Sequence, residues 1–180
     1  MTSTSGDPSR AAPAAPSQFD QFMAQAIAME QEAAQRYEEF ADAMEMHNNR
    51  EVAQMFRKLA GIESRHADEL LAEMGWTELP VVPRIAFEGF EGAETPPVDA
   101  VHYLMTPWHV LQVALAAEER AVRFFTRLLE VATDPAVRRA ATEMLGEERE
   151  HVELVRAWMG RVEQPADGWA VDPDPPRYTD

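Results

Sequence analysis

Apolar residues recur every three or four positions over four long stretches of the chain, the spacing that gives a helix one buried face. Ser17 precedes the first stretch as a candidate N-cap. Thr106-Pro107 and Asp134-Pro135 open the third and fourth stretches with a cap and a proline in the first turn. No stretch alternates apolar and polar residues as a half-buried strand does. We therefore predict an all-α fold, with helices over about 18–46, 51–74, 106–132 and 135–161.

The connections between these stretches differ greatly in length. His47-Asn48-Asn49 and Thr133 provide short turns within each pair of helices, whereas residues 76–105 hold several prolines and glycines and cannot form one regular element. This arrangement predicts a four-helix bundle of two helical hairpins joined by a long crossover at about 76–105. We expect the bundle over 18–161, a flexible N-terminal tail over 1–17 and an irregular C-terminal tail over 162–180.

The composition narrows the classes of function. The chain has 16 Lys and Arg against 32 Asp and Glu, a formal net charge of −16. We expect it to bind neither nucleic acid nor an anionic membrane surface, since both attract basic clusters. It has no cysteine, which excludes disulfides, zinc–thiolate sites and cysteine-held iron–sulfur centres. No apolar run approaches about 18 residues, and residues 1–17 lack the pattern of a secretory signal, so we expect a cytoplasmic protein.

Charged residues interrupt the apolar face of all four predicted helices. Glu30 lies between Ile27 and Ala33 on the inward face of the first helix, and the second and fourth helices each carry a Glu-x-x-His there. An inward charge is costly unless it is paired or binds a metal ion. The inward set comprises Glu30, Glu63, His66, Glu118, Glu148 and His151.

Positions along the sequence place these residues at one level of the bundle. The carboxylates of the first hairpin lie at nearly equal distances before and after Asn48, and those of the second lie at equal distances on either side of Thr133. At about 1.5 Å per residue, all four fall within roughly one helical turn of a common height. The sequence of the second helix also aligns with that of the fourth, and a single shift matches both residues of the Glu-x-x-His. The sequence of the first helix aligns in the same way with that of the third. The chain thus resembles two related hairpins, each with one Glu and one Glu-x-x-His.

Both the spacing and the residue types suit a metal site. Residues three apart share a helix face, so each Glu-x-x-His can bind one ion or two neighbouring ions. Carboxylate and imidazole ligands without thiolate favour iron or manganese. Four carboxylates balance the charge of two divalent ions, and without metal they would repel one another until some became protonated.

Glu, Glu-x-x-His, Glu and Glu-x-x-His in this order on four helices resemble the ferritin-like superfamily, and within it the rubrerythrins and bacterioferritins. The resemblance covers about residues 18–161. By this resemblance the bridging ligands would be Glu63 and Glu148, the terminal carboxylates Glu30 and Glu118, and the histidine ligands His66 and His151.

The chain departs from both groups of relatives. It lacks the cysteine-rich rubredoxin module that rubrerythrins usually carry. Ala121 stands where rubrerythrins often place a further carboxylate, so the set of four Glu and two His is closer to that of bacterioferritins. Ser64 stands where bacterioferritins place a haem-ligating methionine, so no haem is expected.

The resemblance implies a non-haem di-iron oxidoreductase that reacts with peroxide or dioxygen, oxidising ferrous iron or using an external electron-donor protein. Two iron ions per chain are expected, with manganese as the alternative metal. The alternative function is not enzymatic: a non-catalytic iron-binding or iron-delivery protein, or a cargo and interaction module that uses the tails. A bundle that has lost its site is a weaker third hypothesis. A Pro-rich segment follows Arg161 where ferritin cages have a fifth helix, so we expect a homodimer or small homo-oligomer.

A few other polar residues have simpler explanations. Glu119 or Glu147 could replace its neighbour only if a helix were rotated, which would spoil the repeat. Tyr37 is expected in the core, where its phenol could also serve the site. The remaining histidines are expected to be structural: His47, His102 and His109.

Overall fold

The computed structural model describes residues 15–82 and 93–172. The fold consists of α1 (Gln18–Met46), α2 (Arg50–Glu73), α3 (Pro107–Val131) and α4 (Pro135–Met159). No strand occurs among the described residues. The prediction of an all-α fold is confirmed, and the predicted helix bounds agree within about two residues. Within the described part of the chain, none of the helices is long and apolar enough to cross a membrane.

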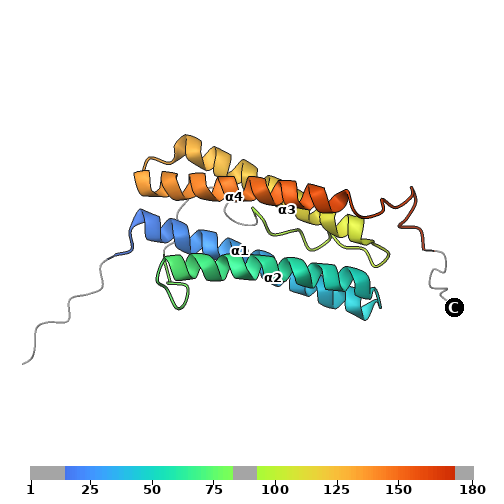
Figure 1. Cartoon of the computed structure of the whole chain (residues 1–180). Helices are drawn as coiled ribbons and strands as arrows, with labels where there is room; N and C mark the ends of the chain where they lie inside the picture. The colour runs from blue at the N-terminus through green and yellow to red at the C-terminus, as the bar shows by residue number, and fades with distance from the viewer. Residues whose placement is uncertain (1–14, 83–92, 173–180) are drawn as a thin grey trace, which may run out of the picture.

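The helices form two antiparallel hairpins, α1–α2 and α3–α4, which lie side by side along their length (Figure 1). Residues 93–106 run along the bundle to the start of α3, which lies at the end where α1 turns into α2 (Figure 1). Asn49 fixes this meeting point, because its Nδ2 donates to the main-chain oxygens of Tyr103 at 3.2 Å and Met105 at 2.8 Å. Residues 83–92 of the predicted crossover, and residues 1–14 and 173–180 of the predicted tails, lie outside the described residues.

Local side chains explain where the helices begin. The Oγ of Ser17 accepts the Asp20 N–H at 3.0 Å, while the Asp20 carboxylate accepts the Ser17 N–H at 2.9 Å, forming a capping box at the start of α1. Asp134 caps α4 by accepting two main-chain N–H groups, at 2.7 and 3.1 Å. At the start of α3 the Nδ1 of His109 accepts the Thr106 N–H at 3.0 Å. His109 therefore has the structural role that the sequence predicted.

The chain after α4 lies against the start of α3. The ring of Trp169 is centred 3.7 Å from that of His109, and the hydroxyl of Tyr103 donates to Asp172 at 2.5 Å. His47 and His102 also lie against Tyr103, with ring centroids 5.6 and 4.7 Å away. These contacts close the end of the bundle at which α3 begins.

Two apolar clusters fill the bundle. One is built from the first half of α1, the second half of α3 and the first half of α4. The other is built from the second halves of α1 and α4 and the first halves of α2 and α3. On every helix the inward carboxylate lies in the interval between these clusters, so apolar packing encloses the polar site on both sides. Representative members are Phe22, Met29, Phe125 and Met144 in the first cluster, and Tyr37, Phe56, Leu111 and Val155 in the second.

Candidate metal centre

The six side chains that the sequence singled out meet in the interval between the two apolar clusters. They form two groups of three, one from each hairpin, and within each group the ligand atoms lie within 4.8 Å of one another. The four glutamates are only 2–6% exposed. The groups are Glu30, Glu63 and His66 from α1–α2, and Glu118, Glu148 and His151 from α3–α4.

The two histidines lie on the more open side of the site. The rings of His66 and His151 stack with their centroids 4.6 Å apart and their planes 6° apart. The Nδ1 of His66 lies 3.6 Å from an oxygen of Glu63, and the Nδ1 of His151 lies 3.4 Å from an oxygen of Glu148. The side chains are 24% and 22% exposed, so this pair separates the buried carboxylates from solvent.

Burial and repulsion by neighbouring carboxylates raise the pKa values of Glu30 and Glu148. Burial, followed by the charges of Glu63 and Glu148, raises the pKa of Glu30 well above its ordinary value. Burial raises the pKa of Glu148 to about 7, although His151 opposes this. Burial lowers the pKa of His151, but Glu118 and Glu148 outweigh it and raise that pKa to about 11. Protons therefore compensate the negative charge of the cluster when no cation does.

A further acidic side chain, which the sequence pattern did not reveal, enters the site from the crossover. Glu94 is 4% exposed. Its carboxylate lies next to the carboxylates of Glu30 and Glu148, and the ligand atoms of the three residues are within 4.8 Å of one another. Burial, followed by the charges of Glu30 and Glu148, raises the pKa of Glu94 well above its ordinary value. Ala121 is buried as an apolar core residue, as predicted. The additional carboxylate thus comes from the segment before α3 and not from α3 itself.

Several carboxylate oxygens in the site lack a hydrogen-bond partner. Among the described residues, the buried Oε2 atoms of Glu30, Glu94 and Glu148 have none, although the Nδ1 of His66 lies 3.9 Å from the Oε2 of Glu30 and the Nδ1 of His151 lies 3.4 Å from the Oε2 of Glu148. Native proteins rarely leave a buried acceptor without a donor or an ion, because its desolvation is not compensated. Three such oxygens in one cluster, next to imidazole nitrogens, are a donor set that suits a hard or borderline cation.

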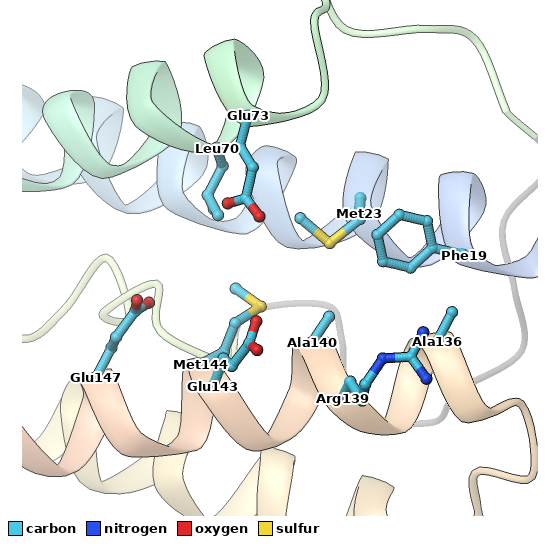
Figure 2. A pocket seen from close by; sticks show the side chains of 10 residues that line it. All are labelled: Phe19, Met23, Leu70, Glu73, Ala136, Arg139, Ala140, Glu143, Met144 and Glu147. Carbon is cyan, nitrogen blue, oxygen red and sulfur yellow. The ribbon is translucent and has the colours of Figure 1, made fainter.

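A hollow of about 210 Å³ lies between α4 on one side and α1 and α2 on the other, next to the site (Figure 2). Leu70 lies about one turn after His66 and Met144 about one turn before Glu148. Figure 2 shows three carboxylates around this hollow, from Glu73, Glu143 and Glu147, together with Phe19, Met23, Ala136, Arg139 and Ala140.

The neighbouring residues agree with the predicted helix register. Glu147 is exposed, and the carboxylate of Glu119 pairs with Arg156 at 3.0 Å. Tyr37 is buried in the core, as predicted, with its ring stacked on Phe56 at a centroid distance of 6.0 Å. Burial, followed by the charge of Glu63, raises the pKa of Tyr37 well above its ordinary value, so the phenol keeps its proton.

Comparison with known proteins agrees with this geometry. The model of the rubrerythrin family matches residues 21–159. Among solved structures, an uncharacterized conserved protein from Magnetospirillum magnetotacticum MS-1 is 36% identical with a TM-score of 0.60, and the match covers 83% of this chain and 99% of that chain. No curated protein matches the chain. The chain belongs to the rubrerythrin family, within the ferritin-like superfamily.

Proposed function

We propose that the chain is a non-haem di-iron oxidoreductase that reacts with peroxide or dioxygen. The observation that carries this proposal is the pair of matched Glu–Glu–His groups, whose four carboxylates are buried and include two oxygens, on Glu30 and Glu148, that make no hydrogen bond among the described residues. Membership of the rubrerythrin family supports it.

The residues present fit two iron ions. Each hairpin offers two carboxylates and one imidazole, and the four carboxylates of the two groups would neutralise two divalent ions. Oxygen and nitrogen donors without thiolate suit iron, with manganese as the alternative. One ion would be held by Glu30, Glu63 and His66, and the other by Glu118, Glu148 and His151.

When bound, the metal pair would supply two electrons, which with two protons reduce one peroxide to two waters or one dioxygen to one peroxide. The side chains around the metal pair would control the access of water and reactants. The apolar clusters keep bulk water from the carboxylates, and the half-buried histidine pair leaves one side for small reactants. In the metal-free protein burial raises the pKa of Glu148 to about 7, so an ion that binds there near neutral pH would displace a proton from this carboxyl. The electrons would come from ferrous iron or from an external donor protein.

Rapid mixing of anaerobic ferrous-loaded protein with peroxide or dioxygen tests the proposal. We expect oxidation by both oxidants to be faster than that of the same ferrous concentration in buffer, and re-reduction by an external donor to be slow. Glu147→Gln serves as a control, because this exposed residue lies next to Glu148 but outside the site.

Three outcomes would change the conclusion. Binding of two ferrous ions without faster oxidation would favour the iron-binding or iron-delivery protein. Rapid turnover of peroxide with almost no reaction toward dioxygen would favour a peroxidase over a ferroxidase. Failure to bind iron would refute the proposal.

A further inference from the structure

In the described part of the crossover, neither packing nor ion pairing explains the environment of Glu94. Glu94 is buried at 4% exposure, with its Oε2 lacking a hydrogen-bond partner among the described residues. We propose that Glu94 is a further metal ligand, which the crossover contributes to the site between the two hairpins. This inference rests on the proposed metal-binding function and deepens it.

The carboxylate of Glu94 approaches both hairpins. Its ligand atom lies within 4.8 Å of those of Glu30 on α1 and Glu148 on α4, which belong to different halves of the site. Among the described residues the buried Oε2 atoms of Glu30 and Glu148 also make no hydrogen bond, and each has an imidazole nitrogen only at ion-pair distance, 3.9 Å for Glu30 and 3.4 Å for Glu148. The three carboxylates therefore lie close enough together for one cation to bind an oxygen of each.

The chain on either side of Glu94 is anchored. Ala93 packs in the first apolar cluster, and the side chain of Pro96 is fully buried. The guanidinium of Arg120 donates to the main-chain oxygens of Glu94 and Thr95, both at 3.4 Å. Arg120 thus holds the backbone of this segment and leaves the carboxylate of Glu94 directed to the site. Arg120 is a positioning residue for Glu94.

The charge count gives this residue a distinct role. With Glu94 the site has five carboxylates, so two divalent ions leave it with a net charge of about −1 and two trivalent ions with about +1. With four carboxylates the corresponding charges would be 0 and +2. Because excess buried charge is costly, the fifth carboxylate stabilises the oxidised pair relative to the reduced pair.

Manganese titration of the full chain tests the assignment. We compare wild type with Glu94→Gln, and with Glu78→Gln as the matched control, since Glu78 lies on the exposed surface of the same crossover. We expect wild type and Glu78→Gln to bind two Mn²⁺ ions per chain, and Glu94→Gln to bind them about tenfold or more weakly, the scale seen when groups around a metal are removed. Hydrogen exchange at the amides of residues 93–95 should slow on metal binding in wild type and much less in Glu94→Gln.

Each result has a defined meaning. If wild type binds no Mn²⁺ and no Fe²⁺, the proposed function fails. If Glu94→Gln matches Glu78→Gln in both metal affinity and hydrogen exchange, only the role of Glu94 fails, and the carboxyl is then a protonated structural group that glutamine replaces. Thermal melts in chelator test whether Glu94→Gln is folded. Its melting temperature should not fall below that of wild type, because removing a buried carboxyl without a donor should not destabilise the metal-free bundle.

Discussion

Replacing Glu148 by glutamine should have opposite effects on the metal-free and metal-loaded protein. Burial raises the pKa of Glu148 from 4.5 to about 7, so at pH 8 the folded protein must ionise a group that resists ionisation. At about 1.4 kcal/mol per pH unit, this costs the metal-free fold roughly 3 kcal/mol. Glutamine has nearly the same shape and no charge, so Glu148→Gln should recover up to about that amount at pH 8. The midpoint of thermal unfolding should then rise by roughly 6–12 °C for a domain of this size.

The metal-loaded protein should respond in the other direction. A ligand that binds only the folded state at about 100 times its dissociation constant stabilises it by roughly 2.7 kcal/mol per site. Glutamine is a weaker ligand than a carboxylate, and Glu148 lies next to both His151 and the carboxylates of its group. Glu148→Gln should therefore lose most of the metal-induced rise in melting temperature.

Circular dichroism melts at pH 8 measure both effects, first in chelator and then with excess Mn²⁺. Glu147→Gln is the control, because Glu147 is exposed and should change neither melt by more than a degree or two. In chelator, the stability gained by Glu148→Gln will be smaller than the full cost of ionising Glu148, since His151 loses an ion-pair partner at 3.4 Å. The reasoning would be refuted if Glu148→Gln melted below wild type in chelator and still showed the full stabilisation by Mn²⁺.

Three further predictions concern the whole protein. Elemental analysis of the loaded chain should give about two iron or manganese ions, because two groups of ligands are present; one tight zinc with the second position empty under excess iron would contradict this. The metal-free protein should lose stability as pH rises from about 5 to 9, because the raised pKa values of Glu30, Glu148 and His151 mean that the folded state binds more protons than the unfolded state. Urea unfolding across that range measures the effect, and stability that rises with pH would show that these shifts are wrong. Light scattering should give a dimer or small oligomer, whereas a closed ferritin-like shell would overturn that expectation.

The sequence predicted the helices because their signals are local. Ser17 and Asp134 accept main-chain N–H groups within their own first turns, and the apolar spacing fixes which side of each helix faces inward. The height of the inward carboxylates also followed from counting, because a straight helix advances by a constant rise and each hairpin turn is short. For these reasons the sequence alone was enough to predict one common level for the four inward carboxylates, which belong to Glu30, Glu63, Glu118 and Glu148.

The contribution of the crossover could not be predicted in the same way. A segment without regular structure has no period, so nothing along the sequence indicates which of its side chains faces inward. Glu94 reaches the site because Ala93, Pro96 and Arg120 hold its backbone, and these are long-range tertiary contacts. The stacking of His66 on His151 likewise depends on how the two hairpins pack together.

The single crossover makes the two halves of the molecule unequal. The internal repeat gives each hairpin the same Glu and Glu-x-x-His, yet the repeat places Phe125 where the first hairpin has Tyr37, and the connection that carries Glu94 occurs once between the hairpins. Two positions that share a ligand set thus differ in their surroundings. Ions added below saturation would accordingly fill the two positions in a preferred order. A protein that has bound one ion would then be a defined species with its own spectrum, instead of a statistical mixture of two equivalent ones.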